Sequence, residues 1–142
     1  MKIDEILELI DSDSELDKNN LDNESLKTPK LHAKYYRIFM EEIRILKSLD
    51  IKYNQVKKDR QSYYLGDLPD EVYKEEPLHK KWLKSEIDIA LKADEKLNEI
   101  DVKRDLQKMK VKLIEDFIKT LNNRSFIIRD AIEFAKFKNG GY

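Results

Sequence analysis

"TPKLHAKYYRIFMEEIRILKSLDIKYNQVKKDRQSYYLG", residues 28–66, is the stretch that decides the fold. Thr28 is a favourable N-cap and Pro29 suits the first helical turn, and neither proline nor glycine recurs before Gly66. A helix from Thr28 to about Tyr64 would be about 50 Å long at the usual rise per residue. That is too long for a compact domain of 142 residues. The helix therefore requires a long partner, either in the same chain or on a neighbouring subunit.

Apolar side chains recur along this helix with the 4,3 spacing of a coiled coil. Two charged residues, Glu42 and Lys52, interrupt the series. Its members are Leu31, Tyr35, Ile38, Ile45, Leu49 and Val56. The spacing predicts that one face of the helix packs against another helix.

The segments before and after this helix also have helical patterns. Residues 2–10 predict a short amphipathic helix, and residues 11–24 are a polar linker. Residues 66–77 contain one glycine and two of the three prolines, so they predict the main loop. We therefore expect an all-α fold of long helices with coiled-coil-like packing.

The C-terminal half predicts two further helical stretches. Apolar stripes indicate helix over residues 80–121, either continuous or bent near Asp101. Asn122-Asn123 is a break signal, and the last helix that follows is apolar on more than one face before Gly140-Gly141. Such a helix is expected to be buried between subunits.

The charges form blocks although they nearly cancel over the whole chain. Residues 1–26 carry a net charge of −7 and residues 27–60 a net charge of +6. We therefore divide the chain into an acidic N-terminal segment with a short helix, 1–26, and a helical domain, 27–142, to which the binding and oligomerisation sites described below belong. No apolar run is long enough to span a membrane. The absence of cysteine fits a reducing cytosol and excludes thiolate metal sites.

The sequence contains no pattern of catalytic residues. Three glycines cannot form a phosphate-binding glycine loop, and His32 and His79 have no partner at ligand spacing. The acidic series after residue 10 has Leu16 where a calcium loop needs glycine. We expect no enzymatic activity, no catalytic residues, no metal and no cofactor.

A basic and aromatic patch lies at the C-terminal end of the long helix. On a helix, Lys57, Arg60, Gln61 and Tyr64 share one face, and Lys58 flanks it. Lysine and arginine neutralise phosphates without reading sequence, and a tyrosine ring can stack on an exposed base. The patch therefore suits single-stranded nucleic acid. Upstream, a basic stripe interrupted by Glu41 extends it through Lys30, Lys34, Arg37 and Arg44.

Three patches give the chain a resemblance to a known family. They are "KDRQSYYLG" (58–66), "KSEIDIALKADEKLNEID" (84–101) and "RSFIIR" (124–129). The matching positions include Lys58, Arg60, Tyr63, Tyr64 and Gly66 in the first patch, Asp94 and Asp101 in the second, and Arg124, Phe126, Ile128 and Arg129 in the third. In order and spacing, these patches resemble the UvsY-type recombination mediators of tailed bacteriophages. The similarity covers about residues 30–138 and is weaker in the acidic loop before residue 80.

The resemblance implies a function, partners and an assembly. Such proteins bind single-stranded DNA, contact a phage RecA-like recombinase and a phage single-strand-binding protein, and help the recombinase replace that protein on the strand. They form ring-like homo-oligomers of six or seven subunits and act in the cytoplasm of the infected host. By this resemblance, Lys58 and Arg60 are DNA-contacting positions, and the last helix is the assembly element.

The expected sites combine both lines of reasoning. The DNA-binding residues are Lys57, Lys58, Arg60 and Tyr64, with Lys34 and Arg37 upstream, whereas Tyr63 is expected to pack. The expected oligomerisation residues are Phe126, Ile128, Ile132 and Phe134.

Two alternatives remain open from the charge blocks. The chain could be a structural coiled-coil oligomer or adaptor without DNA binding, whose basic stripe pairs with the acidic segment of a neighbour. The acidic segment could also mimic DNA and compete for the basic face.

Overall fold

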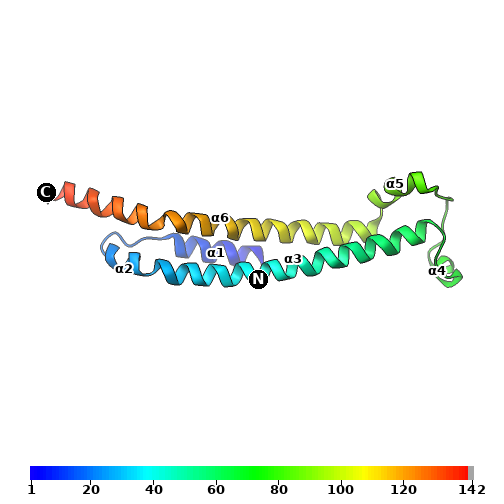
Figure 1. Cartoon of the computed structure of the whole chain (residues 1–142), viewed down its shortest axis with the longest axis horizontal. Coiled ribbons are helices and arrows are strands. Elements are labelled where there is room, and N and C mark those ends of the chain that lie inside the picture. Colours follow the sequence, from blue (N-terminus) through cyan, green and yellow to red (C-terminus); the bar gives the residue numbers. More distant parts are fainter. Residues whose placement is uncertain (141–142) are drawn as a thin grey trace. The chain divides into compact units, whose positions relative to one another are not determined.

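The computed structural model describes residues 1–140, and the regular elements within these residues are all helical. The elements in order are α1 (Ile3–Ser14), α2 (Leu21–Leu26), α3 (Thr28–Tyr64), α4 (Asp70–Glu75), the 3-10 turn η1 (Lys84–Glu86), α5 (Ile87–Lys92) and α6 (Glu95–Lys138) (Figure 1). The expected all-α fold is confirmed. In this part of the chain, none of the helices is both long and apolar enough to cross a membrane.

The long helix α3 has the expected bounds, and a glycine ends it. Gly66 has a φ of 78°, a left-handed conformation that favours glycine. The amide of Asp67 donates to the carbonyl of Ser62 at 3.0 Å, and that of Gly66 donates to the carbonyl of Tyr63 at 3.1 Å. This pair of hydrogen bonds is a Schellman motif, which satisfies carbonyls at the helix end.

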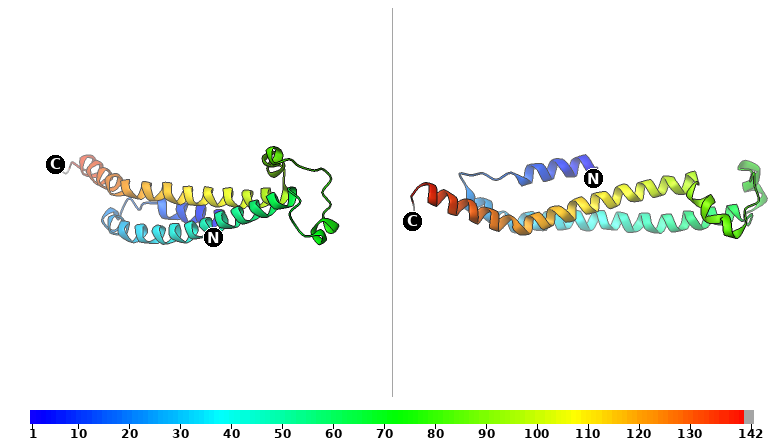
Figure 2. Two further views of the ribbon diagram at one scale, coloured as in Figure 1. Left: turned by 45° about the vertical axis from the view of Figure 1, so that its right-hand side comes forward. Right: turned by 90° about the horizontal axis from the view of Figure 1, so that it is seen from above.

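The chain divides into two compact units, and α3 and α6 contribute to both. Unit 1 contains residues 1–43 and the chain from Met109 onward, and unit 2 contains Arg44–Lys108. In each unit α6 lies beside α3 and runs in the opposite direction, as the views of Figures 1 and 2 agree. The partner that α3 requires is therefore present in the same chain.

The core of unit 1 includes the N-terminal helix. Ile6 of α1 is fully buried in one cluster with Tyr35 of α3 and Phe117 of α6. The Tyr35 and Phe117 rings meet edge to face, with centroids 4.5 Å apart. Removing α1 would therefore open this core. By its contacts, the acidic segment belongs to the same compact unit as the first part of α3 and the second part of α6. The charges instead place a boundary after residue 26.

The core of unit 2 is built from α5, the start of α6 and the second half of α3. Ile87 and Leu91 of α5 are buried together with Leu97 and Ile100 of α6. Leu49, Tyr53 and Val56 of α3, together with Tyr64, Leu65 and Trp82, pack against this cluster.

Two predicted features of α6 are wrong. The helix does not begin near residue 80, because η1, α5 and a turn at Asp94 precede it. It then continues without a break through Asp101 and Asn122-Asn123 to Lys138. Leu121 and Ile128, on either side of the asparagines, are buried, and their packing outweighs the weak helix propensity of asparagine. Gly140 follows with a φ of 66°, and Gly141 lies outside the described residues.

Candidate nucleic-acid interface

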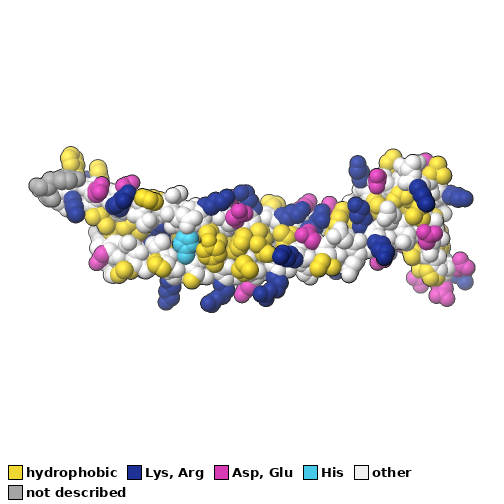
Figure 3. Space-filling model, viewed as in Figure 1, with side chains coloured by type: hydrophobic (Ala, Val, Ile, Leu, Met, Phe, Trp, Pro, Cys, Tyr) yellow, Lys and Arg dark blue, Asp and Glu magenta, His cyan; other side chains and the backbone are white. Residues whose placement is uncertain are grey.

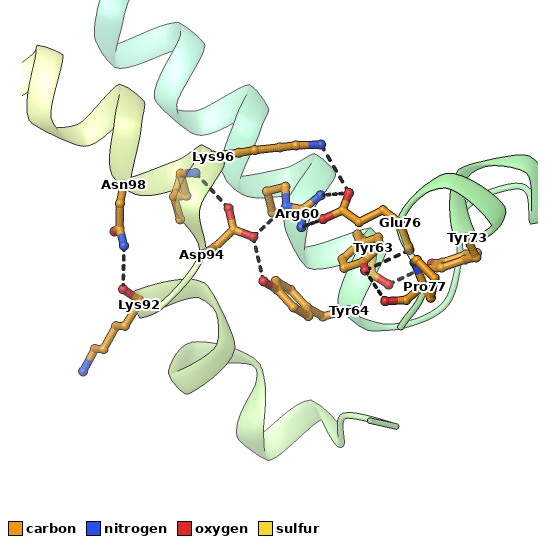
Figure 4. Close-up of polar contacts among 11 residues, drawn as sticks. Arg60, Tyr63, Tyr64, Tyr73, Glu76, Pro77, Lys92, Asp94, Lys96 and Asn98 are labelled. Atoms are coloured by element: carbon orange, nitrogen blue, oxygen red, sulfur yellow. Dashed lines mark hydrogen bonds and ion pairs between the residues drawn. The ribbon is translucent and has the colours of Figure 1, made fainter. Parts of the chain in front are cut away.

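Arg60 lies in the last turns of α3 and is held between two carboxylates (Figure 4). Its Nε atom donates to Asp94 Oδ2 at 2.7 Å. Its Nη2 and Nη1 atoms donate to the two oxygens of Glu76, at 2.9 and 3.2 Å. Only 8% of the Arg60 side chain is exposed, against 2% for Asp94 and 40% for Glu76. The guanidinium is therefore buried and bound on two sides.

Two tyrosines complete this cluster, which we call the Arg60 network (Arg60, Tyr63, Tyr64, Glu76 and Asp94). The Arg60 guanidinium carbon lies 4.2 Å from the Tyr63 ring centroid and 5.4 Å from that of Tyr64. The Tyr64 hydroxyl donates to Asp94 Oδ2 at 2.6 Å. The Tyr63 hydroxyl donates to the main-chain carbonyl of Glu76 at 3.1 Å. The network thus fixes the end of α3 to the start of α6 and to the loop after α4.

Asp94 also caps the N-terminus of α6. Its Oδ1 atom accepts a hydrogen bond of 2.8 Å from the amide of Leu97, the third residue of the helix. An aspartate at this position satisfies one of the free amides at a helix start. This explains why Asp94 interrupts the apolar stripe of the sequence: it stands between α5 and α6.

The contacts stabilise the charged forms of the network. Burial alone would raise the pKa of Asp94, but the hydrogen bonds from Tyr64, Leu97 and Arg60 outweigh it and hold that pKa below its usual range. Burial alone would lower the pKa of Arg60, but the hydrogen bonds to Glu76 and Asp94 raise it overall. Hydrogen bonding from Arg60 also lowers the pKa of Glu76.

The structure corrects the expected placement of Arg60 and Tyr64. Both side chains were expected on an exposed basic face, but Arg60 is buried and Tyr64 is half-buried with its hydroxyl bound to Asp94. Tyr63 is buried, as expected of a packing residue. Lys57 and Lys58 are both exposed. Of the basic residues in this stretch, only the two lysines are accessible to a ligand.

The sequence does contain a signal for this arrangement. Starting from Leu49, spacings of four and three residues lead through Tyr53 and Val56 to Arg60 and Tyr63. Arg60 and Tyr63 are therefore on the face of α3 that packs. The predicted stripe passed through Lys52, so the inward orientation of Arg60 was missed. The face that packs passes through Tyr53 instead, and the Arg104 guanidinium carbon lies 3.8 Å from the centroid of the Tyr53 ring. No pattern in the sequence points to Glu76 as a partner.

In unit 1, the expected basic residues of α3 are accessible as well. Lys34 and Arg37 are exposed, and Figure 3 shows basic side chains projecting from the N-terminal half of α3 on the face in view. Lys34 forms an ion pair of 2.6 Å with Asp13 of α1. Asp13 also accepts a hydrogen bond of 2.7 Å from the Tyr35 hydroxyl. Burial opposes ionisation of Asp13, but the hydrogen bonds from Lys34 and Tyr35 lower its pKa.

The third sequence patch also forms a buried cluster, the Arg124 network (Glu24, Thr28 and Arg124). Arg124 donates to the main-chain carbonyl of Glu24, to the Thr28 hydroxyl at 2.6 Å and to Glu24 Oε2 at 2.8 Å. The side chains of Glu24 and Arg124 are 6% and 7% exposed. This network ties α6 to the junction of α2 and α3.

The four expected oligomerisation residues lie in different environments. Phe126 and Phe134 are 54% and 62% exposed. Ile132 is half-buried, and Ile128 is 1% exposed. The expectation of Ile128 as an interface residue is corrected, because it is buried within its own subunit.

Comparison with known proteins now identifies the family. The family described as "Recombination, repair and ssDNA binding protein UvsY" matches residues 9–141. The chain belongs to the UvsY family. Its members are phage proteins of recombination, repair and single-stranded DNA binding. Comparison with curated protein sequences gave no match.

Solved structures of a UvsY protein have the same fold. One crystal structure of the bacteriophage T4 recombination mediator protein UvsY, lattice type II, has a TM-score of 0.83 at 18% identity, covering 98% of each chain. Another, lattice type IV, has a TM-score of 0.81 at 16% identity, covering 97% of this chain and 99% of that one. The fold is thus shared at low sequence identity.

The three sequence patches now have a structural explanation in this UvsY-family chain. Arg60, Tyr63 and Tyr64 of the first patch meet Asp94 of the second in the Arg60 network. Arg124 of the third patch joins α6 to the start of α3. These five residues that carry the resemblance therefore hold helices together. Lys58 is exposed.

Proposed function

We propose that this protein is a recombination mediator that binds single-stranded DNA. It would promote loading of a RecA-like phage recombinase onto strands coated by a single-strand-binding protein. The observation that carries the proposal is a pair of exposed lysines, Lys57 and Lys58, in a chain of a family that binds single-stranded DNA. They lie on α3 directly before the turn that the Arg60 network fixes.

In this proposal, the basic residues divide into two roles. Lys57 and Lys58 in unit 2, and Arg37 in unit 1, would contact phosphates, which gives affinity without sequence preference. Lys34 would do so by exchanging its ion pair with Asp13 for a phosphate. Arg60 would act as a positioning residue, because its donors are engaged by Asp94 and Glu76. It would support DNA binding by keeping the end of α3 in place.

The assembly and the partners also belong to the proposal. The exposed side chains of Phe126 and Phe134, with those of Ile127 and Phe137, support self-association, since several large apolar side chains exposed along one stretch of a helix leave apolar surface that association would bury. A homo-oligomer of six or seven subunits would bind one strand at several sites, so that weak contacts add up to high avidity. Displacement of the single-strand-binding protein by the recombinase would then take place on this bound strand, in the cytoplasm of the infected host.

The alternative, an adaptor without DNA binding, is less well supported. It requires the acidic N-terminal segment to pair with the basic stripe of a neighbour. Asp13 already pairs with Lys34 in the same chain, at 2.6 Å. One member of the basic stripe, Lys34, therefore has an acidic partner without a second subunit.

A salt titration of DNA binding tests the proposal. We expect the double variant Lys57→Ala, Lys58→Ala to bind single-stranded DNA more weakly at low salt. The slope of log affinity against log salt should decrease by about 0.7 for each ion pair lost. Fluorescence anisotropy of a labelled oligonucleotide measures both, and the mass of the protein is determined in parallel.

A matched control is the double variant Lys112→Ala, Lys119→Ala, which removes the same charge from exposed positions of α6. We expect it to retain the parental slope. Absence of single-stranded DNA binding by the parental protein at low salt would overturn the proposal and favour the adaptor. Equal losses in both double variants would overturn the assignment of Lys57 and Lys58.

A further inference from the structure

A pocket beside the Arg60 network has aromatic walls and basic residues at its edge. Its volume is about 340 Å³, and it lies entirely within unit 2. The rings of Tyr63, Tyr64 and Trp82 line it, together with the segment from Glu76 to Lys80. Volumes of this size are at the lower end of the range for small-ligand sites.

The rings of the pocket are held in fixed positions. The Tyr64 and Trp82 rings meet edge to face, with centroids 5.8 Å apart and planes at 78°. The Tyr64 hydroxyl is anchored on Asp94, and the Tyr63 ring stacks on that of Tyr73 at 5.4 Å. Trp82 packs partly against the core of unit 2 and is half-buried. A ligand would therefore meet preordered rings, which reduces the entropy that binding costs.

One cationic side chain, that of Lys80, contacts one of these rings. Lys80 Nζ lies over the face of the Trp82 ring, 4.4 Å from its centroid, so a base that stacks on this face would displace the ammonium toward the adjoining phosphate. It also forms an ion pair of 3.3 Å with Glu86, and the Lys80 side chain remains 58% exposed. Lys81 is exposed beside it in the sequence. A mobile ammonium at a stacking ring matches a nucleotide, in which a sugar joins a flat base to a phosphate.

We propose that this pocket receives one base of single-stranded DNA, with Trp82 as the stacking platform and Lys80 at the adjoining phosphate. This inference rests on the proposed function, and it adds a contact that only an unpaired base can make. In a duplex the bases are already stacked and paired, so this contact favours single strands. Trp82 and Lys80 lie on the segment between α4 and η1, whereas Tyr64 of the same pocket belongs to the patch of α3 that the sequence indicated.

Trp82 is the only tryptophan of the chain, so its emission reports directly on the pocket. We expect a single-stranded oligonucleotide to quench Trp82 fluorescence, and an abasic strand of equal length and charge to quench it far less. Anisotropy of the same strands, labelled, gives the affinities. The ratio of affinities for the normal and the abasic strand measures base stacking separately from phosphate contacts.

Two substitutions separate stacking from packing at this position. Trp82→Phe keeps an aromatic ring and should retain most of the affinity. Trp82→Leu fills much of the space without a stacking surface and should bind the normal strand between about 5-fold and about 150-fold more weakly. Its affinity for the abasic strand should stay at the parental value. Circular dichroism checks that both variants remain helical.

The outcomes distinguish this inference from the proposed function. If the protein binds single-stranded DNA but Trp82 emission is unchanged and Trp82→Leu has parental affinity, the base pocket is overturned and the proposed function stands. Equal quenching by the normal and abasic strands also overturns base stacking. If neither strand binds, the proposed function fails, and the pocket proposal fails with it.

Discussion

Two buried arginines, Arg124 and Arg60, connect the same pair of helices in different ways. Arg124 donates to a main-chain carbonyl, a hydroxyl and a carboxylate that is only 6% exposed. Arg60 has one carboxylate partner of 2% exposure, Asp94, and one of 40% exposure, Glu76. The carboxylate partner of Arg124 is therefore buried, whereas Arg60 has one buried carboxylate partner and one at the surface.

The difference indicates what each network can do besides stabilising the fold. In the Arg124 network each group that Arg124 contacts is engaged within the subunit, so its role is structural. The exposed side of the Arg60 network consists of Glu76 and the loop that follows it, which also line the aromatic pocket. A network of this kind can position a binding surface, because its inner half is rigid and its outer half faces solvent.

The largest expected effects come from removing the arginines. Arg60→Ala should lower the free energy of unfolding by about 3–5 kcal/mol, because it leaves the buried carboxylate of Asp94 without its cation. Arg124→Ala should lower it by less, because Lys27 still pairs with Glu24 at 2.7 Å. Denaturant unfolding measures the loss, and hydrogen exchange locates it: unit 2 should lose protection in the first variant and unit 1 in the second.

A matched control for Arg60→Ala is Lys58→Ala, two residues away on the exposed side of α3. It should change stability by no more than about 0.5 kcal/mol. Arg60→Lys is informative as well, because it keeps the charge but loses the planar fork that bridges two carboxylates. If Arg60→Ala has parental stability, the Arg60 network does not stabilise unit 2.

Acid provides the next test, and it acts on Asp94. The folded pKa of Asp94 is lowered, so its contribution to stability is present above the unfolded pKa of about 3.9. This contribution is lost as the pH falls through the lowered folded value. Asp94→Asn should lower stability at pH 7 by about 1.5–3 kcal/mol, the range for hydrogen bonds to charged groups. It should also flatten the loss of stability below pH 4.

Asp59→Asn serves as the control for the acid experiment. Asp59 is an exposed carboxylate directly before Arg60 in the sequence. Its replacement should leave both the stability at pH 7 and the shape of the acid unfolding curve close to parental. A steep acid transition that persists in Asp94→Asn would assign acid unfolding to other carboxylates.

The fold was largely predictable because its main signals are local. The bounds of α3 follow from Thr28-Pro29 and from Gly66, which the Schellman motif requires in a left-handed conformation. The continuity of α6 through Asn122-Asn123 was not predictable from propensity. It depends on the burial of Leu121, Arg124 and Ile128 against segments far away in the sequence.

The site was less predictable than the fold, and Arg60 shows why. Its basic character suggests a phosphate contact, and only its spacing from Leu49, Tyr53 and Val56 indicates that it faces inward. Glu76 lies 16 residues away and Asp94 lies 34 residues away, so neither pairing has a local signal. Lys57 and Lys58 are exposed as the patch predicts, because exposure of a lysine is the default on a helix surface.

The smallest expected effect is that of Glu76→Gln, and it tests the open side of the Arg60 network. Because the Glu76 side chain is 40% exposed, its ion pairs with Arg60 and Lys96 are screened by water. We expect a loss of at most about 1 kcal/mol by denaturant unfolding, less at high salt. The control is Glu75→Gln, an exposed neighbour.

The loop itself should stay attached, since the Tyr63 hydroxyl donates to the main-chain carbonyl of Glu76 regardless of its side chain. If Glu76→Gln instead costs as much as Arg60→Ala, the Glu76 side of the Arg60 network is as closed to water as its Asp94 side. In that case the exposure of Glu76 would not explain why the aromatic pocket beside the network is open to solvent.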